Sequence, residues 1–168
     1  MGTIHIRPSL RSDLPRLTEI YNHYVVNTPV TFDLEPYLPE QRASWLAQFA
    51  ETGRHRLLVA EEDAAILGYA GTTAWRAKAA YAPTVETTIY CAPEAIGKGA
   101  GTKLYAALFE SLAREDVHRI VAGYTLPNAA SAALHQRFGF RPVGIFKEVG
   151  RKFGKYWDVA WNERPLQL

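Results

Sequence analysis

Three glycines at alternate positions, Gly97, Gly99 and Gly101, lie between a strand-like segment and a helix-like segment. Such a turn presents free backbone N–H groups at the positive end of a helix, where a phosphate or pyrophosphate binds without a cationic side chain. The preceding segment carries one carboxylate, Glu86. Residues 84–105 therefore predict a phosphorylated ligand held beside a group that can accept a proton.

The elements that must position these groups are a strand and the helix after it. Side chains alternate along a strand, so Glu86 should share a face with Thr84, Thr88 and Tyr90, opposite a core-facing row of Val85, Ile89 and Cys91. The spacing of Leu104, Leu108 and Leu112 predicts a helix over 101–114. A short buried strand at 120–124 then completes a strand–helix–strand unit, which must be parallel and right-handed.

The rest of the chain alternates between strand and helix patterns with no repeat or linker. The order βααβββαβαββ predicts an α+β fold in one domain, 1–168. Phe32 lies in a proline-rich loop and is either an anchor for a lid or a plug into the core. The other predicted elements are strands at 3–8, 56–61, 65–75, 141–149 and 155–162, and helices at 13–26, 40–51 and 128–138.

Composition excludes several classes of protein. The formal charge of +2 is small and the basic residues are dispersed, so neither nucleic acid nor an anionic membrane is an expected partner. The N-terminus lacks a signal-peptide pattern, and a cytoplasmic protein is expected. The single cysteine, Cys91, excludes an internal disulfide and reads as a packing residue rather than a reactive thiol. Nine tyrosines and four tryptophans, several in loops, suit a small organic ligand.

Two motifs give this order of elements a family resemblance. IGKGAG at 96–101 and NAASAALHQRFGF at 128–140 resemble the GNAT superfamily of N-acetyltransferases, over nearly the whole chain. Residues 22–36, 75–90 and 150–159 are similar to the phosphinothricin acetyltransferase family and to relatives that acetylate methionine sulfoximine or methionine sulfone. The resemblance implies a mostly antiparallel mixed sheet with helices on both faces and a parallel strand pair splayed at the cofactor site. It also implies acetyl-CoA as co-substrate, no metal, and a homodimer.

In the superfamily the glycine turn binds the pyrophosphate of acetyl-CoA in the motif (Q/R)xxGx(G/A). Here Ile96 replaces the leading polar residue, with Lys98 or Lys103 available to compensate. Asn128 resembles the asparagine that bonds the pantetheine arm, and it could instead cap a helix. The spacing does not fit a Walker A loop or a dinucleotide fingerprint. The expected cofactor contacts are Ile89, Tyr90, Cys91, Gly97, Lys98, Gly99, Ala100, Gly101, Thr102, Asn128 and Ser131.

Acetyl transfer requires a neutral amine, yet an α-amine has a pKa of roughly 7.7–8.0. Glu86 is the expected base, because the resemblance places the base at the glutamate of TVE and partial burial would raise its pKa. Its alternative is a solvated or ion-paired glutamate, with Arg76 or Lys78 as partner. His135 occupies the position where the resemblance implies a proton donor to the leaving thiolate, and it could instead be a packed histidine.

A guanidinium near the base would orient the acceptor's carboxylate. Arg76 is the candidate, with Lys78 where close relatives often have a second arginine. Phe32, Trp75, Tyr81 and Thr84 could line a pocket for the acceptor's side chain, although each alone could belong to the core. The C-terminal segment with Lys152, Phe153, Tyr156 and Trp157 is expected to close the site or to form a dimer contact.

The sequence therefore favours an acetyl-CoA-dependent N-acetyltransferase that acts by direct transfer on the α-amine of phosphinothricin, methionine sulfoximine or methionine sulfone. A second hypothesis keeps the enzyme class and changes the acceptor to a peptide N-terminus or a polyamine. A third is a non-catalytic acyl-CoA-binding module, to which the replacement at Ile96 lends some support. Release of thiol on adding acceptors to protein and acetyl-CoA would separate the three.

Overall fold

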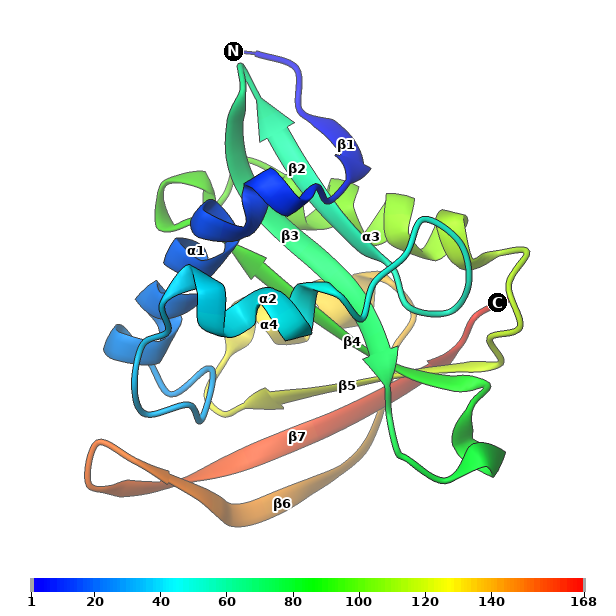
Figure 1. The fold of residues 1–168 in the computed structure, drawn as a ribbon. Helices are drawn as coiled ribbons and strands as arrows, with labels where there is room; N and C mark the ends of the chain where they lie inside the picture. The colour runs from blue at the N-terminus through cyan, green and yellow to red at the C-terminus, as the bar shows by residue number, and fades with distance from the viewer. Residues whose placement is uncertain (1, 168) are drawn as a thin grey trace.

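The computed structural model describes residues 2–167, so the ends of the predicted domain, Met1 and Leu168, lie outside the described residues. Its centre is a seven-stranded sheet in the order β1-β2-β3-β4-β5-β7-β6 (Figure 1). The predicted order of helices and strands is confirmed. The strands are β1 (His5–Pro8), β2 (Leu57–Glu62), β3 (Ala65–Ala74), β4 (Thr84–Cys91), β5 (Arg119–Thr125), β6 (Arg141–Lys152) and β7 (Lys155–Pro165). The helices are α1 (Leu14–Asn27), α2 (Ala43–Leu46), α3 (Ala100–Leu112) and α4 (Ala129–Arg137).

Every pair of neighbouring strands is antiparallel except β4 and β5. These two pair in parallel through Thr84, Val85 and Glu86, and the pairing stops there although β4 continues to Cys91. The backbone of β4 beyond Glu86 thus has no ladder partner on its β5 side. The mixed sheet with a splayed parallel pair is confirmed, and the gap between the two strands opens next to Glu86.

Helices cover both faces of the sheet: α1 and α2 lie on one face, α3 and α4 on the other (Figure 1). Apolar periodicity explains this packing, because Leu17 and Ile20 of α1 and Leu104 and Leu108 of α3 are at most 1% exposed. Between the helices, Val85 of β4 is fully buried in the same core. The two helical layers therefore hold β4 from both sides, at the centre of the sheet.

The predicted helix at 40–51 is wrong in its extent. A 3₁₀ turn at Pro39–Arg42 leads into α2, which is a single turn. The chain then folds back toward β2, and Ala50 N–H donates to the carbonyl of His55 at 3.0 Å. The apolar residues whose spacing predicts a longer helix pack against each other instead: the rings of Trp45 and Phe49 meet edge to face, with centroids 5.2 Å apart.

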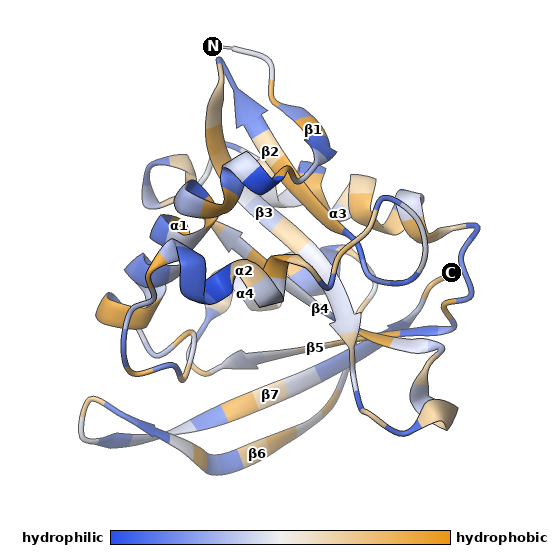
Figure 2. Cartoon of the chain, viewed as in Figure 1, coloured by the Kyte–Doolittle hydropathy of each residue, from blue (hydrophilic) through white to orange (hydrophobic). Residues whose placement is uncertain are grey.

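The C-terminal hairpin is longer than predicted, because β6 extends to Lys152 and β7 to Pro165. Its two-residue turn, Phe153–Gly154, has positive φ at both positions, as a type I′ turn requires. β6 is an edge strand whose residues from Arg141 to Val149 are all exposed. Figure 2 shows hydrophobic and hydrophilic residues following one another along it.

The loop after α1 is tied to this hairpin. The ring of Phe32 lies against Gly150, where an added Cβ would sit 2.1 Å from a ring atom. Lys152, which is 3% exposed, donates through Nζ to the carbonyl of Thr31 at 2.8 Å. Phe32 is therefore an anchor between the loop and β6 and is not part of the main core cluster.

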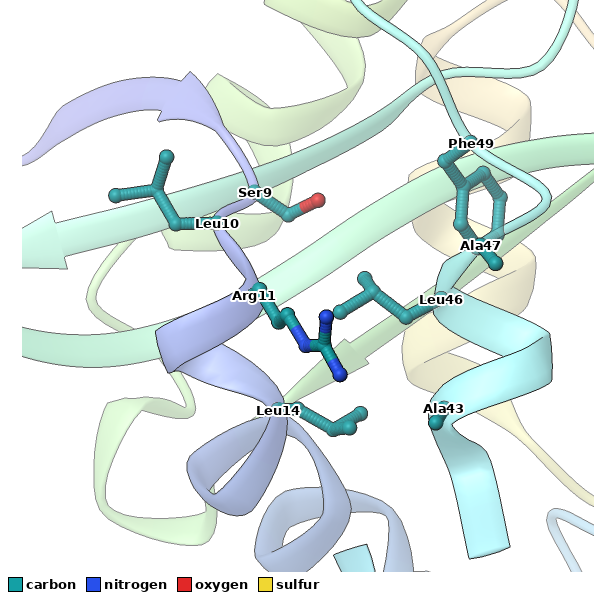
Figure 3. A pocket seen from close by; sticks show the side chains of 8 residues that line it. All are labelled: Ser9, Leu10, Arg11, Leu14, Ala43, Leu46, Ala47 and Phe49. Carbon is teal, nitrogen blue, oxygen red and sulfur yellow. The ribbon is translucent and has the colours of Figure 1, made fainter. Parts of the chain in front are cut away.

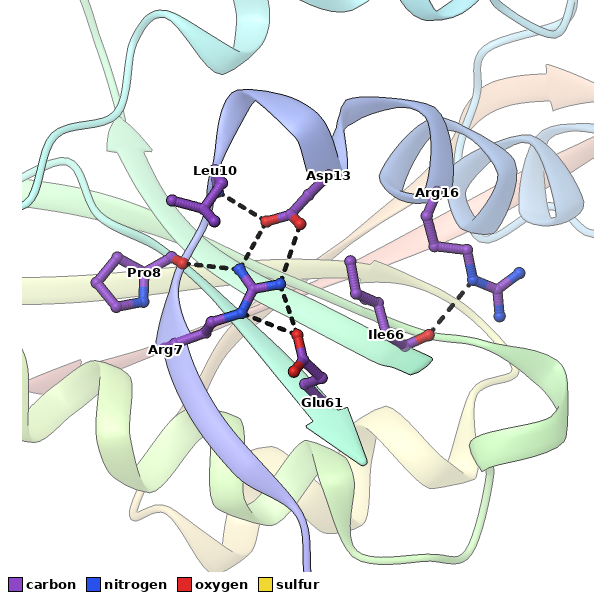
Figure 4. Close-up of polar contacts among 7 residues, drawn as sticks. All are labelled: Arg7, Pro8, Leu10, Asp13, Arg16, Glu61 and Ile66. Atoms are coloured by element: carbon purple, nitrogen blue, oxygen red, sulfur yellow. Dashed lines mark hydrogen bonds and ion pairs between the residues drawn. The ribbon is translucent and has the colours of Figure 1, made fainter. Parts of the chain in front are cut away.

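Three charged side chains join β1 to β2 and to the start of α1, and we call them the N-terminal polar cluster (Figure 4). Arg7 donates to both carboxylate oxygens of Asp13, at 2.8 and 3.0 Å, and to Glu61 at 2.7 and 2.9 Å. The N–H of Leu10 adds a further bond to Asp13 at 2.7 Å. This cluster fixes the direction in which the chain leaves β1 and enters α1.

Candidate active site

A cavity of about 580 Å³ opens where β4 and β5 diverge. We call it the cofactor-side cavity. It is bounded by the end of β4, the glycine turn and the first turns of α3 and α4. Of the residues expected to contact the cofactor, every one except Lys98 lines it. The lining is Tyr24, Val30, Ile89, Tyr90, Cys91, Ala95, Ile96, Gly97, Gly99, Ala100, Gly101, Thr102, Asn128, Ala130, Ser131, Leu134 and Arg137.

The glycine turn has the conformation that an anion site needs. Gly97 and Gly99 have φ of +82° and +83°, and Gly99 caps the N-terminus of α3. An added Cβ at either glycine would meet nothing within 4 Å, so the space in front of the turn is open. Across residues 2–167, the N–H groups of Gly99, Gly101 and Thr102 have no backbone or side-chain acceptor. Such free N–H groups at a helix start fit a pyrophosphate.

Two other predicted contacts have local structural functions as well. Asn128 caps α4 by accepting a bond from the N–H of Ser131 at 3.0 Å through Oδ1, which leaves its Nδ2 free for another acceptor. Capping and ligand contact therefore do not compete. Cys91 is half-buried beside Gly101, and burial raises the pKa of its thiol, as expected for a packing residue.

A smaller cavity of about 50 Å³ lies in the gap between the diverging strands. It is lined by Thr87, Thr88, Ile89 and Tyr90 of β4, by Gly123 and Tyr124 of β5, and by Val30, Tyr105, Ser131 and His135. It shares Tyr90 and Ile89 with the cofactor-side cavity. We call it the transfer cavity, because it adjoins the cofactor-side cavity and includes Thr88 and Tyr90 on the face of β4 that carries Glu86.

His135 lies in the wall of the transfer cavity and is only 4% exposed. Its Nδ1 must donate to the Ser131 carbonyl, 2.6 Å away, so in the neutral ring Nε2 accepts from the Tyr105 hydroxyl at 3.1 Å. Burial lowers the pKa of His135 and outweighs the opposing effect of the carbonyl. A neutral ring whose one N–H is already engaged is poorly placed to protonate a thiolate. The contacts with Tyr105 and with the stacked ring of Tyr124 favour a positioning role for His135, and the donor role stays a prediction.

Glu86 is half-buried on the face of β4 opposite the buried Val85 and Thr87, as the alternation predicted. Burial raises the pKa of its carboxyl. Among the described residues it forms no ion pair or hydrogen bond, so the predicted alternatives with Arg76 or Lys78 are not formed. An unpaired, partly desolvated carboxylate beside the strand gap is suited to accept a proton.

The residues expected to bind the acceptor line none of these cavities; those at 75–84 lie between the end of β3 and Glu86 in β4, whereas Phe32 lies against Gly150. Glu86 is paired with Thr73 across the sheet, so Trp75 and Arg76 follow just after the end of β3. The Arg76 guanidinium stacks over the ring of Trp75 at 4.7 Å, and the Tyr81 ring meets Trp75 edge-on at 5.2 Å. Arg76, Lys78 and Tyr81 are exposed, and Thr84 and Phe32 are half-buried.

A third cavity, about 290 Å³ in volume, lies on the same face of β4 as Glu86, beneath α1 and α2. We call it the acceptor-side cavity. Sequence reasoning missed all of its residues except Tyr90, because aromatic residues at helical or strand spacing are normally interpreted as core. It also missed Arg137 in the cofactor-side cavity. The acceptor-side lining is Tyr21, Asp33, Tyr37, Gln41, Arg42, Trp45, Tyr69, Thr88 and Tyr90.

A separate cavity of about 380 Å³ lies between the start of α1 and the segment around α2 (Figure 3). Its walls are mainly apolar: Arg11 and Leu14 lie on the side of α1, and Leu46 and Phe49 face them from the segment around α2. It shares no lining residue with the three cavities around β4. Within residues 2–167 no group of His, Cys, Asp or Glu side chains is arranged to hold a metal ion. No helix in the same range is long and apolar enough to cross a bilayer.

Comparisons with known structures agree with this geometry. A phosphinothricin acetyltransferase from Sinorhizobium meliloti, solved in complex with acetyl-CoA, superposes with a TM-score of 0.90 at 32% identity. The match covers 97% of this chain and 88% of that one. An N-acetyltransferase from Staphylococcus aureus superposes with a TM-score of 0.92 at 32% identity, over 99% of this chain and 100% of that one.

Sequence relatives extend the agreement. A phosphinothricin N-acetyltransferase from Streptomyces coelicolor is 58% identical over 165 residues, which is 97% of this chain and 96% of the relative. An L-methionine sulfoximine/L-methionine sulfone acetyltransferase from Pseudomonas aeruginosa is 35% identical over 96% of this chain and 94% of the relative. The family model for the acetyltransferase (GNAT) domain matches residues 6–161. Fold, glycine turn and relatives together show that the chain belongs to the GNAT family of acetyltransferases.

Proposed function

We propose that this protein transfers the acetyl group of acetyl-CoA to the α-amine of a small amino acid analogue, with phosphinothricin, methionine sulfoximine and methionine sulfone as candidate acceptors. One observation carries the proposal. The unpaired, half-buried Glu86 lies where β4 and β5 part, and the β4 residues that follow it line both a cavity shaped for a phosphorylated ligand and a cavity lined by aromatic residues. The two relatives named for such acceptors match nearly the whole chain.

The cofactor-side cavity would bind and orient acetyl-CoA. The free N–H groups of the glycine turn would hold the pyrophosphate, and Arg137 at the cavity wall adds a guanidinium that can pair with a phosphate. Ile96 is 66% exposed at the mouth of this cavity, so the replaced polar residue leaves the turn's backbone donors untouched. Acetyl-CoA supplies the activated acetyl group, and its thioester end would reach the transfer cavity.

Glu86 prepares the acceptor. An α-amine is mostly protonated at neutral pH, and the raised pKa of Glu86 makes it a better proton acceptor than an ordinary glutamate. Once neutral, the amine attacks the thioester carbonyl directly in a ternary complex. The C–N bond forms, the C–S bond breaks, CoA leaves as its thiolate, and the proton lost from the attacking nitrogen neutralises that thiolate. We assign polarisation of that carbonyl to a backbone N–H group of β4 in the stretch where it has left β5. His135 keeps the tyrosines of the transfer cavity in place.

Thiol release tests the proposal. Purified protein with acetyl-CoA should release CoA when phosphinothricin, methionine sulfoximine or methionine sulfone is added, and the acetylated acceptor should appear by mass spectrometry. Release only with a peptide bearing a free N-terminus, or only with spermidine, would favour the second hypothesis. Binding of acetyl-CoA without turnover of any acceptor would favour a non-catalytic acyl-CoA-binding module.

We also infer that the protein forms a homodimer through β6. This edge strand exposes a row of large apolar side chains, and such an edge invites pairing with another chain. Sedimentation velocity should give twice the chain mass, and Phe146→Asp should shift it to the monomer, whereas a monomeric wild type would refute the inference. The exposed apolar residues of the hairpin are Val143, Ile145, Phe146, Val149, Phe153 and Tyr156.

Two broader proposals accompany this function. We propose that residues 1–168 act as one N-acetyltransferase domain, since strands from both ends of the chain, β1 and β7, belong to the same sheet. We propose a cytoplasmic location, because the lone cysteine is kept as a free packed thiol, as is common in reducing compartments. Fractionation of cells that express a tagged protein would test the location.

A further inference from the structure

The acceptor-side cavity contains a buried cation that forms no ion pair within residues 2–167. Arg42 is 6% exposed, and its guanidinium is sandwiched between the rings of Tyr21 at 4.3 Å and Trp45 at 3.9 Å. Its one hydrogen bond within residues 2–167 runs from Nη1 to the Leu17 carbonyl at 3.3 Å, and no carboxylate there forms an ion pair with it. A guanidinium has five N–H donors, and burying it without an anion is costly. Aromatic stacking offsets only part of that cost.

A second polar group in the same cavity also lacks a partner. Tyr69 is 1% exposed, lines the cavity, and its buried hydroxyl has no hydrogen-bond partner among the described residues. Buried hydroxyls are nearly always satisfied, so an orphaned one that lines a cavity indicates a missing acceptor. Burial raises the pKa of Tyr69 and outweighs the opposing effect of the nearby Arg42 guanidinium, so the hydroxyl remains protonated and can donate.

The one carboxylate of the cavity is already engaged. Asp33 accepts a bond from the Tyr21 hydroxyl at 2.5 Å, and the same hydroxyl lies 2.7 Å from Thr31. Asp33 thus keeps the wall of the cavity in place while Arg42 and Tyr69 present donors to its interior. A ligand group that fits must offer oxygen acceptors to these donors and an apolar surface to the aromatic rings.

The cavity adjoins the place where acetyl transfer would occur. Its lining residues Thr88 and Tyr90 also line the transfer cavity. Thr88 is two residues from Glu86 on the same face of β4, about 6.6 Å along the strand. An amino acid whose amine lies at Glu86 could therefore extend its side chain along β4 into the acceptor-side cavity. Its α-carboxylate would then be directed toward the end of β3, where Arg76 and Lys78 follow.

We propose that the acceptor-side cavity holds the oxygen-bearing end of the acceptor's side chain, with Arg42 and Tyr69 donating to its oxygens and the aromatic walls contacting its methyl group. The inference rests on the proposed function and names the feature of the substrate that this site selects. A phosphinate, a sulfoximine and a sulfone share this chemistry: a tetrahedral phosphorus or sulfur atom that carries both oxygen and a methyl group. Amino acids of similar length without those oxygens leave both donors unpaired and are poorer acceptors.

The first test is Tyr69→Phe, which removes only the orphaned hydroxyl. Because that hydroxyl has no partner, the melting temperature of the free protein should not fall. The KM for methionine sulfone should rise about tenfold while kcat and the KM for acetyl-CoA stay within about twofold. Ser111→Ala is the control: it also removes one hydroxyl, which bonds the Leu108 carbonyl in α3 away from the cavities, and its kinetics should match wild type.

An acceptor pair separates oxygen recognition from general packing. The ratio of kcat/KM for methionine sulfone to that for norleucine, which lacks the oxygens, should fall about tenfold in Tyr69→Phe. Arg42→Lys keeps the positive charge and loses the planar guanidinium fork. It should therefore weaken the binding of phosphinothricin, whose phosphinate is anionic, more than the binding of methionine sulfone. Unchanged KM values and an unchanged ratio in both variants would overturn the inference.

Direct binding keeps the inference separable from the proposed function. Isothermal titration of methionine sulfone into wild type and Tyr69→Phe should show about tenfold weaker binding to the variant. If wild type turns over none of the acceptors, the proposed function fails, and this titration still decides whether the cavity recognises the oxygens. Equal affinity for the two proteins would refute the inference even if wild type is active.

Discussion

Two arginines in this protein occupy opposite situations. In the N-terminal polar cluster, Arg7 donates to the carboxylates of both Asp13 and Glu61, and Asp13 also accepts the Leu10 N–H (Figure 4). In the acceptor-side cavity, Arg42 is more deeply buried and has a single carbonyl as hydrogen-bond partner among the described residues. The first arginine is satisfied within the fold, and the second is not.

The contrast separates structural polar groups from functional ones. Glu86 and the Tyr69 hydroxyl also lack partners, and both lie on the α1 side of the sheet. Unpaired groups reduce the stability of the free protein, and the proposed function gives each of them a ligand group to pair with. Removing a paired group should therefore cost stability and leave activity intact, whereas removing an unpaired one should do the reverse.

The largest effect is expected for Glu86→Gln. Loss of the base should lower kcat by about 10²–10³-fold at neutral pH, measured as CoA release. The same variant should melt at a higher temperature than wild type near pH 7, because burial raises the pKa of Glu86 and the folded state disfavours its charged form. This gain should vanish as the pH falls below the ordinary glutamate pKa, where both states hold the proton. Full turnover by the variant would remove Glu86 from the mechanism.

Asp13→Asn should show the opposite behaviour. Burial alone would raise the pKa of Asp13, but the bonds from Arg7 and Leu10 outweigh it and hold the pKa below its usual range. The carboxylate thus stabilises the fold above the unfolded-state pKa, and this contribution is lost as the pH falls through the lower folded-state value. The variant should lose about 2 kcal/mol of stability near pH 7 in urea titrations, and less at low pH. A changed KM for either substrate would contradict the distinction between paired groups, which stabilise the fold, and unpaired groups, which act on substrates.

Gly150→Val probes the loop that carries Asp33 and Tyr37. An added Cβ would lie 2.1 Å from the ring of Phe32, so the ring must move, at a cost of about 1 kcal/mol. The KM for the acceptor should rise while that for acetyl-CoA does not. Gly144→Ala in the same strand is the matched control, because its Cβ would meet nothing within 4 Å. Equal kinetics for the two variants would show that the loop anchor does not shape the acceptor-side cavity.

The smallest kinetic effect is expected for His135→Asn. As a positioning residue His135 loses its bond to Tyr105, which should lower stability by about 1 kcal/mol and change kcat less than about threefold. The pH profile of kcat should keep its shape, since burial lowers the pKa of His135 and leaves it neutral. A loss of 100-fold or more, with an altered alkaline limb, would restore the acid role that the sequence suggested.

Local signals predicted the fold well. Glu86, Gly99 and Asn128 were assigned to a strand, a turn and a helix start from their immediate neighbours, and the structure places them so. The extent of α2 was wrong because its end depends on a contact with the chain returning toward β2, which no local pattern encodes. The proposed roles of the site residues remain predictions.

The acceptor-side cavity could not be predicted for a similar reason. Arg42 and Tyr69 are 27 residues apart in the chain, and they share a cavity only because the segment around α2 packs over β3. Each also satisfies an ordinary interpretation: a surface arginine next to a proline-rich loop, and an apolar position in a buried strand. Only the finished fold shows that neither has the partner its burial requires.

Tyr90 has a consequence for how the binding of one substrate affects the affinity for the other. Tyr90 lines the cofactor-side, transfer and acceptor-side cavities at once. When one ligand orders its ring, the entropy cost of ordering it is already included in that first binding step. A second ligand in a neighbouring cavity then binds without that cost. The two substrates should therefore bind with positive thermodynamic coupling, and each should raise the affinity for the other by the same factor.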